Sequence, residues 1–350
     1  MKRMTLERTP SIAVIVPNRN DARYLPRCLR SVIEQEVGPE ELIIVDDGST
    51  DDSVEVIRSL IAGNARAQLI VNPVNLGTYG AMEVGLQQAR SDHALFLAAN
   101  DFLLPGIFAR AKTCFARSPG VGVWSALAWL VDEDDRPIRL HPSAIVALND
   151  AIFSPEDCVR LARRFGNWFT GTTLIYRLDA LRAAGGFDPG YGAPADLFAA
   201  LTVASLRGAA YTPEPFAAIR RHAGSFLHGA LTDVAALEST LKRFAELGPK
   251  RSPKLFTGDF TERTTLRFRF AAVRASGGTL IVEIAERVPG WRRFALTMLD
   301  YLSPASLRIL RVAFAFLILR PFDILPTLWY RVIGWIVVRV RLKLRGARPP

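Results

Sequence analysis

The sequence predicts an α/β protein with a doubly wound, mostly parallel sheet. The first observation is that apolar strand-like segments and amphipathic helical segments alternate four times between residues 11 and 101. The second observation is that polar and acidic residues directly follow the predicted strands, after residues 16, 45, 71 and 97. Because ligands bind outside the carboxyl ends of the strands in open α/β sheets, we expect one binding crevice at that edge.

The predicted strands of this region are short apolar runs that end at turn residues. They cover residues 11–17, 42–45, 68–71 and 94–97. Helices with a 3.6-residue apolar period are predicted at about residues 24–35, after residue 50, and around residues 82–89. Ser49 or Thr50 can cap the second of these helices.

The second strand carries the strongest local signal. Its four apolar residues, three of them β-branched, are followed by Asp46, Asp47, a glycine and two hydroxyl residues. A buried parallel strand that ends in an acidic turn has this order, so we expect a polar ligand beside the two carboxylates. Helix capping alone is the alternative explanation for an isolated Asp-Asp-Gly-Ser sequence, and the neighbouring strand ends favour the ligand.

The segments beyond residue 101 continue the α/β pattern. An extended run is predicted at residues 121–131, a loop entering a strand at 165–176, a short helix ending at 183–188, and another extended stretch at 211–219. Asp196 opens an apolar helix at residues 197–206, which it can also cap.

The region after residue 235 has weaker signals. An amphipathic helix through residues 237–247 is predicted to stop at Gly248-Pro249. Leu266, Phe268 and Phe270 alternate with arginines, which indicates a strand, although a helix is compatible with the same residues.

Five motifs, in this order, resemble those of the inverting family 2 glycosyltransferases, which have the GT-A fold. They are Val-Ile-Val-Pro at residues 14–17 with Asn20; the stretch at residues 43–51; Asn75 with Gly77; Asn100-Asp101; and Gly-Gly-Phe-Asp at residues 185–188 with Asp196-Leu197-Phe198. The resemblance covers roughly residues 11–225 and implies a nucleotide-sugar donor.

The resemblance also implies where the donor binds. Asp46 and Asp47 are expected to hold the nucleotide base and ribose, because carboxylates accept hydrogen bonds from ribose hydroxyls and from an imide N–H. The other donor-binding residues that it implies are Pro17, Asn18, Arg19, Asn75, Gly77 and Asn100.

A divalent cation, Mg²⁺ or Mn²⁺, is the cofactor that the resemblance implies, since the departing diphosphate needs its charge neutralised. Asp101 and His222 are the expected ligands, because hard cations take carboxylate oxygens and some family members place a His near the metal. Asn100 stands where a carboxylate is usual in the family's Asp-x-Asp motif, and its carbonyl oxygen would coordinate with less charge.

Asp196 is the general base that the resemblance implies. It would take the proton of the acceptor hydroxyl while the anomeric carbon is attacked from the face opposite the leaving group, which inverts the configuration. The family often has Glu-Asp where this chain has Ala195-Asp196. The Gln-x-x-Arg-Trp motif of processive synthases is absent from the sequence, so we expect one sugar per encounter, transferred to a glycan or lipid-linked acceptor.

The charge of the chain is concentrated at its C-terminal end. The net charge is +10, and residues 301–350 hold nine Lys and Arg against one Asp. This segment is also apolar and contains Trp329, Tyr330 and Trp335. Basic and apolar residues together indicate an anionic membrane surface rather than nucleic acid as the partner.

The two apolar runs of this tail, residues 312–319 and 324–340, do not reach the roughly 20 uninterrupted residues that a spanning helix needs. We expect a C-terminal helical, membrane-associating extension made of two interfacial helices on the inner leaflet. A helical pair packed on the catalytic domain and a re-entrant hairpin are the alternatives.

The predicted organisation has four parts: an N-terminal tail at residues 1–9, a GT-A domain at 10–235, a helical or irregular extension at 236–300, and the basic amphipathic segment at 301–350. Three widely spaced cysteines favour a reducing compartment, and the apolar run at 12–16 is too short for a signal sequence. The expected location is therefore cytoplasmic, at the inner face of the cell membrane. The rival hypothesis, suggested by Asn100 and Ala195, is a non-catalytic nucleotide-sugar-binding or scaffold protein that has kept the fold.

Overall fold

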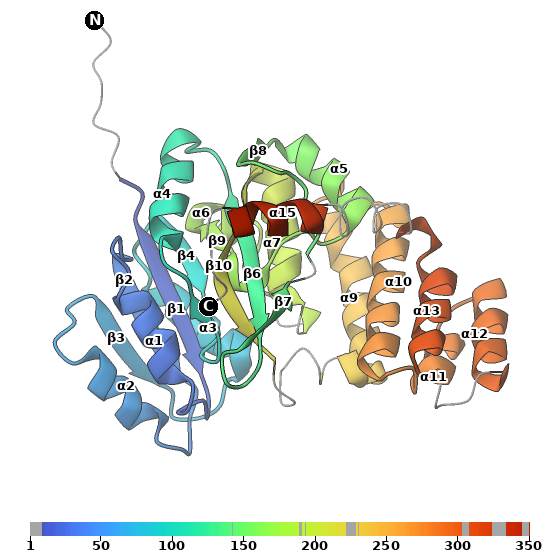
Figure 1. Cartoon of the computed structure of the whole chain (residues 1–350), viewed down its shortest axis with the longest axis horizontal. Helices are drawn as coiled ribbons and strands as arrows, with labels where there is room; N and C mark the ends of the chain where they lie inside the picture. Colours follow the sequence, from blue (N-terminus) through green and yellow to red (C-terminus); the bar gives the residue numbers. More distant parts are fainter. Residues whose placement is uncertain are drawn as a thin grey trace, which may run out of the picture.

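The central sheet has the strand order β3-β2-β1-β4-β9-β6-β10-β5, with β7 beside β6 and β8 beside β10 (Figure 1). This computed structural model describes residues 9–141, 143–188, 191–192, 194–221, 229, 231–302, 308–323, 334–344 and 350. The strands are β1 Ile12–Asn18, β2 Glu41–Asp46, β3 Ala67–Val71, β4 His93–Phe96, β5 Phe102–Leu103, β6 Val123–Val131, β7 Pro137–Leu140, β8 Ala151–Phe153, β9 Ile175–Arg177 and β10 Ala209–Arg220.

The sheet is mixed. Strands β1 to β4 pair in parallel, and so do β6 and β10. The prediction of a mostly parallel sheet is confirmed for these strands. It is wrong for β5, β7, β8 and β9, whose pairings are antiparallel. These four strands are only two to four residues long, too short for an alternating pattern to reveal them.

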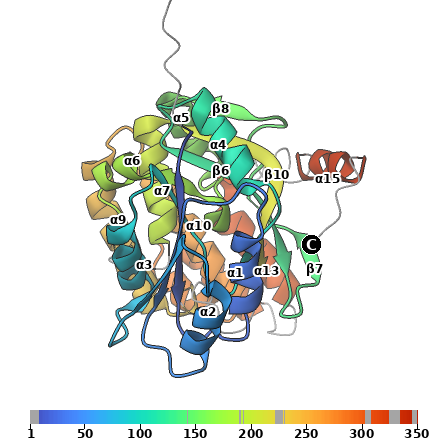
Figure 2. The same ribbon diagram turned by 90° about the vertical axis from the view of Figure 1, so that its left-hand side faces the viewer.

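Helices cover both faces of the sheet, as Figures 1 and 2 show. Successive residues of a strand point to opposite faces. In β1, Ile12 and Val14 enter a core formed with α1 (Leu25–Ile33), α2 (Ser53–Ile61) and α4 (Ile107–Arg117), whereas Ala13 and Ile15 enter a core formed with α3 (Gly77–Gln88) and α7 (Ala195–Arg207). Burial on both faces explains why the strands are continuously apolar.

A glycine lets α3 approach the sheet closely. A Cβ atom at Gly85 would lie 2.4 Å from Cγ2 of Ile15 and 3.3 Å from Cγ2 of Val45. This contact holds the helix so that its first residues, Gly77 and Thr78, lie at the carboxyl edge of the sheet.

The remaining helices of the first 220 residues pack around α7. Helix α5 (Pro155–Phe165) lies against α7, and α6 (Leu178–Ala183) follows β9. A 3₁₀ turn, η1 (Gly171–Thr173), contacts β6, β10 and β4. It therefore lies at the middle of the sheet, next to the carboxyl edge.

The C-terminal helices form a second lobe at the right of Figure 1. They are α9 Val234–Arg251, α10 Gly258–Ala275, α11 Ile281–Glu286, α12 Trp291–Leu302 and α13 Arg308–Leu319. They share an apolar cluster that includes Leu241, Phe270 and Leu296. Phe244 and Phe260, however, belong to the main core, so α9 and α10 also join the lobe to the sheet domain.

Three local predictions are wrong. Helix α2 begins at Ser53 after Asp52 and has no side-chain cap, because Ser49 bonds to Asp46 instead. Helix α9 runs through Gly248-Pro249 to Arg251; Gly248 packs against the ring of Phe256, where a Cβ would lie 2.4 Å from Cδ1. Residues 266–270 belong to helix α10, as the alternative had it, and are not a strand.

The two tail helices lie in different places. Helix α13 packs on α10 and α12, whereas α15 (Gly334–Leu344) lies next to β10, with Val338 and Leu342 in the main core (Figures 1 and 2). Within the described ranges, no helix is both long and apolar enough to cross a membrane.

Candidate active site

A cavity of about 760 Å³ opens at the carboxyl edge of the parallel strands. We call it the strand-end cavity. It is lined by residues that follow β1, β2, β3 and β4, and by the first turn of α3. Every predicted donor-binding residue except Asp46 lines it: Pro17, Asn18, Arg19, Asp47, Asn75, Gly77 and Asn100. The topology has thus brought together side chains that lie up to 83 positions apart in the sequence.

Asp46 holds the turn after β2 together from inside. Its side chain is fully buried and accepts hydrogen bonds from Nδ2 of Asn18 (2.7 Å), from the Ser49 hydroxyl (2.6 Å) and from the Ser49 backbone N–H (3.0 Å). A buried carboxylate with three donors is well satisfied. The structure places Asp46 behind the cavity wall, where it positions Asn18 and Ser49.

Asp47 presents one oxygen to the rest of the fold and leaves the other available. Its Oδ1 accepts from Nδ2 of Asn72 (2.8 Å) and from the backbone N–H of Leu76 (2.9 Å). Oδ2 has no hydrogen-bond partner in the described part of the chain. Because Asp47 lines the strand-end cavity, this oxygen can accept a hydrogen bond from a ligand.

The loops after β1 and β2 brace each other. Asn20, at φ 57°, accepts through Oδ1 from the backbone N–H of Thr50 (2.7 Å), and its own N–H donates to the Ser49 hydroxyl (3.0 Å). Asp51 accepts from the N–H of Ala22 (3.1 Å). These cross-links fix the floor of the cavity before any ligand arrives. The family motif containing Asn20 and the hydroxyl residues therefore has a structural role here.

The N-terminus of α3 opens onto the same cavity. Asn75 accepts from the N–H of Gly77 (2.9 Å), and no side chain caps the helix at Leu76. Free N–H groups and the helix dipole favour an anionic group at such a terminus. The exposed cation Arg19 also lines the cavity. Both features suit a diphosphate.

Asp101 points into the protein and is not among the residues that line the strand-end cavity. Its Oδ2 accepts from the Thr172 hydroxyl (2.7 Å), and its Oδ1 accepts from the backbone N–H of Arg220 (2.9 Å). Burial raises the pKa of Asp101 to about 6. The guanidinium of Arg220 bonds to the carbonyl of Asn100 and to Asp135, and it lies 4.4 Å from the ring centroid of Tyr24.

Asp101 is the one implied metal ligand that the described residues include. Each of its oxygens accepts one hydrogen bond from the protein, and Asn100 contributes no charge. Across the described ranges, no group of three or more His, Cys, Asp and Glu is placed to hold a metal ion. His222, the other predicted ligand, lies outside the described residues.

Asp196 lies in the first turn of α7. Its Oδ1 accepts from the N–H of Leu197 (2.7 Å), while Oδ2 has no hydrogen-bond partner within the described residues and lies against Gly171. Burial raises the pKa of Asp196 to about 6. The Tyr176 hydroxyl donates to the Asp196 carbonyl (2.8 Å) and fixes the start of the helix. A carboxylate with one free oxygen and a pKa near the working pH can serve as a general base.

The turn η1 connects the two acidic groups. Thr172 donates to Asp101, and the neighbouring Gly171 faces Oδ2 of Asp196, from which a Cβ at residue 171 would lie only 3.0 Å away. The sequence did not reveal this role, because Gly-Thr-Thr at residues 171–173 has no distinctive spacing. Asn72 and Arg220 likewise have no sequence signal that points to their contacts with Asp47 and Asp101. Asp135, in the acidic turn after β6, pairs with buried Arg220.

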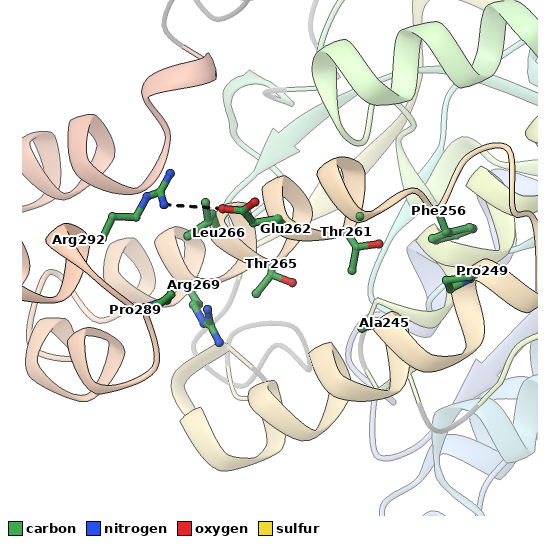
Figure 3. Close-up of a pocket in the computed structure, with 11 residues that line it drawn as sticks. Ala245, Pro249, Phe256, Thr261, Glu262, Thr265, Leu266, Arg269, Pro289 and Arg292 are labelled. Carbon is green, nitrogen blue, oxygen red and sulfur yellow. Dashed lines mark ion pairs between the residues drawn. The ribbon is translucent and has the colours of Figure 1, made fainter.

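A further cavity, of about 420 Å³, lies in the C-terminal lobe (Figure 3). It is lined by residues of α9 and α10 together with Pro289 and Arg292. Its charges are already paired: Arg292 lies 3.7 Å from Glu262, and Arg269 lies 2.7 Å from Glu238. None of the predicted site residues lines it, so we place the active site at the strand-end cavity.

The described fold matches two solved glycosyltransferase structures. S. aureus TarS 1–349 in complex with UDP-GlcNAc gives a TM-score of 0.56, covering 89% of this chain and 91% of that chain at 16% identity. The mannosyltransferase PcManGT from Pyrobaculum calidifontis, in complex with GDP-Man and Mn²⁺, gives 0.54, covering 89% and 86% at 18% identity. At such identities the likeness shows the fold alone, and it confirms the predicted GT-A sheet.

A sequence match covers the first part of the chain. Residues 13–117 match the model of glycosyl transferase family 2, so the resemblance seen in the motifs is confirmed. An uncharacterized glycosyltransferase from Nostoc sp. is 34% identical over 184 residues, which are 51% of this chain and 54% of the relative. The chain spans about half or less of the length of the curated relatives that it matches.

Proposed function

We propose that this protein is a non-processive, inverting glycosyltransferase that moves a sugar from a nucleotide-diphosphate donor to a hydroxyl of a glycan or lipid-linked acceptor. The observation that carries the proposal is the strand-end cavity: the donor-binding residues implied by the family motifs, except Asp46, line one space at the carboxyl edge of the sheet. The GT-A fold and the family match support nucleotide-sugar transfer as the activity.

The donor's nucleotide is assigned to the β1–β2 side of the cavity. Oδ2 of Asp47 accepts a hydrogen bond from the base or the ribose, and Pro17 and Asn18 form the adjoining wall. The diphosphate is assigned to the side formed by Arg19, Asn100 and the N-terminus of α3. In this arrangement Asp46 acts through Asn18 and Ser49 as a positioning residue.

The acceptor hydroxyl is assigned to Asp196. The free Oδ2 takes the hydroxyl proton as the oxygen attacks the anomeric carbon. The C–O bond to the diphosphate breaks as the new glycosidic bond forms, and the diphosphate leaves with the bonding pair. Attack from the face opposite the leaving group inverts the anomeric centre.

A divalent cation, Mg²⁺ or Mn²⁺, is a separate proposal that rests on the family resemblance. When bound, it would neutralise charge on the departing diphosphate. Asp101 would hold such an ion through the lone pairs that its hydrogen bonds with Thr172 and Arg220 leave unused. Donor affinity measured with Mn²⁺ and with a chelator tests the proposal, which fails if the two affinities agree.

Membrane association is proposed from the apolar surface of α12 and α13. Large apolar side chains there are exposed, among them Ile309 (86%), Tyr301 (82%), Leu302 (73%) and Phe294 (68%). An exposed patch of this kind, next to basic residues such as Arg293, suits an interfacial contact with anionic lipid. We propose that the chain is divided into a GT-A domain at residues 10–235, an extension at 236–300 and a membrane-associating segment at 301–350. The protein would then lie at the inner face of the cell membrane.

The rival hypothesis of a non-catalytic scaffold is not favoured. A scaffold would not need a half-buried carboxylate with an unbonded oxygen at the start of α7, since taking such a group out of water costs free energy. Titration with UDP, GDP and dTDP sugars, followed by assay of donor hydrolysis, separates the two hypotheses. We expect at least one donor to bind and to be consumed; binding without any turnover would support the scaffold.

A further inference from the structure

A second cavity, with both apolar and polar side chains in its lining, lies between the sheet domain and the C-terminal lobe. This cavity, of about 240 Å³, is lined from one side by Leu197 and Leu201 of α7, and from the other by Thr264, Arg267 and Arg274 of α10. We call it the α7–α10 cavity. Leu197 directly follows the proposed base Asp196, so the cavity lies near the start of α7, and it shares no lining residue with the strand-end cavity.

Two buried polar atoms at the α7–α10 cavity have no partner in the described structure. They are Nη1 of Arg267 and the hydroxyl oxygen of Thr264. Nε and Nη2 of Arg267 donate to Asp323 (2.9 and 2.7 Å), which also pairs with Arg320, another residue that lines the cavity. One carboxylate thus serves two guanidiniums. Orphaned buried donors are costly unless a ligand satisfies them.

Three further arginines have no carboxylate partner in the described residues, and one of them, Arg274, lines the cavity. They are Arg139 on β7, Arg221 directly after β10, and Arg274; we call them the arginine cluster. Residue 139 lies opposite Leu130 in the β6–β7 pair, and the N–H of Arg221 donates to the carbonyl of Val131 (2.9 Å). The two backbones therefore meet at the carboxyl end of β6.

The fold brings these charges together against their repulsion. Burial lowers the pKa of Arg274, although the side chain keeps access to solvent, and repulsion from Arg139 and Arg221 lowers it further. The segments outside the described ranges contain a single carboxylate, Glu7. The arginines of the Figure 3 cavity, in contrast, are paired with glutamates. The arginine cluster therefore has the composition of an anion-binding site.

We propose that the α7–α10 cavity and the arginine cluster bind a phosphate group of the acceptor. A phosphate monoester or diphosphate carries about two negative charges and several acceptor oxygens, whereas a carboxylate carries one charge. Guanidiniums bind phosphate oxygens in pairs. The acceptor is therefore a phosphorylated glycan or a lipid phosphate whose hydroxyl reaches Asp196. This inference rests on the proposed transfer reaction.

The test uses the full chain saturated with the tightest-binding nucleoside diphosphate, so that phosphate probes cannot enter the strand-end cavity. Phenyl phosphate is then titrated into the wild type, Arg274→Gln, and the double variant Arg139→Gln/Arg221→Gln. We expect the cluster variants to lose at least tenfold in phenyl phosphate affinity, as is typical when a charge-assisted hydrogen bond is removed. Arg117→Gln, an equally exposed arginine on α4, is the matched control and should bind as the wild type does.

Two further readouts separate binding from structure. Because the charge of Arg274 is disfavoured in the folded state, Arg274→Gln should melt at the same temperature as the wild type or higher, and Arg274→Lys should recover part of the affinity. Cluster variants that bind phenyl phosphate normally would overturn the proposal. So would variants that weaken the nucleotide instead, since the cluster would then belong to the donor site.

Vesicles distinguish the two sources of the phosphate. Flotation is compared between vesicles of phosphatidylcholine alone and vesicles with one-fifth phosphatidic acid, a phosphate monoester. Recruitment by phosphatidic acid that Arg274→Gln abolishes supports a lipid phosphate; phenyl phosphate binding without such recruitment supports a soluble phosphorylated glycan. Absence of nucleotide binding in the same protein would contradict the proposed function, whereas nucleotide binding without cluster-dependent phosphate binding would contradict only this inference.

Discussion

Adjacent aspartates in the turn after β2 have different tasks, although the sequence presents them as a pair. Asp46 is enclosed and bonded to Asn18 and Ser49, whereas Asp47 keeps Oδ2 available at the cavity. The sequence could predict that both carboxylates lie at the strand end. It could not assign them, because only the path of the turn decides which side chain faces inward.

Asp47→Asn should separate ligand binding from folding. The amide keeps an oxygen for Asn72 and the N–H of Leu76, so we expect a change in stability below about 1 kcal/mol. It replaces the free oxygen with a donor, so donor affinity should fall at least tenfold in a calorimetric titration, equivalent to about 1.4 kcal/mol. Unchanged affinity would remove Asp47 from the donor site.

Asp46→Ala should act in the opposite way. The substitution removes the acceptor of the Ser49 N–H and leaves the buried amide of Asn18 with only the Ser49 hydroxyl (3.2 Å), which costs about 1–3 kcal/mol of unfolding free energy. Urea denaturation measures this loss. If Asp46→Ala were as stable as the wild type, the structural role assigned to Asp46 would be wrong.

The buried acids predict a pH dependence. The pKa of Asp196 is raised to about 6, so its base form is populated as the pH rises through that value, and kcat/KM should rise with it. The free energy of unfolding changes in the opposite direction. Burial favours the neutral form of Asp196, so the stabilising contribution of this residue is fully present below pH 3.8 and is lost as the pH rises through about 6.

Asp101 has the same raised pKa and therefore needs its own control. Asp101→Asn should keep the rise in kcat/KM near pH 6 if Asp196 causes it. A profile that becomes flat in Asp101→Asn would assign the titration to Asp101 instead.

Helix α3 shows how an element sets the geometry of the site. Gly85 allows the helix to touch β1 and β2, which places its N-terminus at the cavity. Gly85→Ala should cost about 1–3 kcal/mol of unfolding free energy, because the new methyl group would overlap Ile15. Gly120→Ala, where a Cβ meets nothing within 4 Å, is the matched control for denaturant unfolding. Equal stability of the two variants would contradict the close packing of α3.

Elements with a clear period were predictable from sequence. The strands and helices from β1 to β4 and helix α7 appear close to their expected ranges. The 3₁₀ turn η1 and the short antiparallel strands were not predictable, because their conformation depends on contacts with β4, β6 and β10. The sequence around helix α10 is compatible with a strand or a helix, because arginines alternate with Leu266, Phe268 and Phe270 there.

The residues of the candidate site can likewise be divided into those that were predictable from sequence and those that were not. Its cavity wall was predictable because each residue directly follows a strand or opens a helix. The partners of Asp101 were not, since Thr172 and Arg220 are distant in sequence and lie beside it only after the sheet has formed. The metal ligands that the family motif implied therefore remain a prediction.

At the scale of the whole molecule, the sheet domain and the C-terminal lobe have different surfaces. The lobe exposes large apolar side chains on α12 and α13, including Ile309 and Leu302. Ile309→Glu/Leu302→Glu should reduce co-flotation with anionic vesicles severalfold while the melting temperature stays unchanged, because both side chains are exposed. Ile152→Glu on β8, another exposed isoleucine, should float as the wild type does. Equal flotation of all three proteins would contradict membrane association through α12 and α13.

The most direct test of the central claim is single-turnover transfer by wild type, Asp196→Asn and Asp196→Glu with the donor that binds best. The proposed base predicts that Asp196→Asn binds the donor with wild-type affinity and loses about 10²–10⁴-fold in transfer rate, with partial activity in Asp196→Glu. Transfer by Asp196→Asn at the wild-type rate, with the donor still bound, would contradict the assignment of Asp196 and the mechanism built on it.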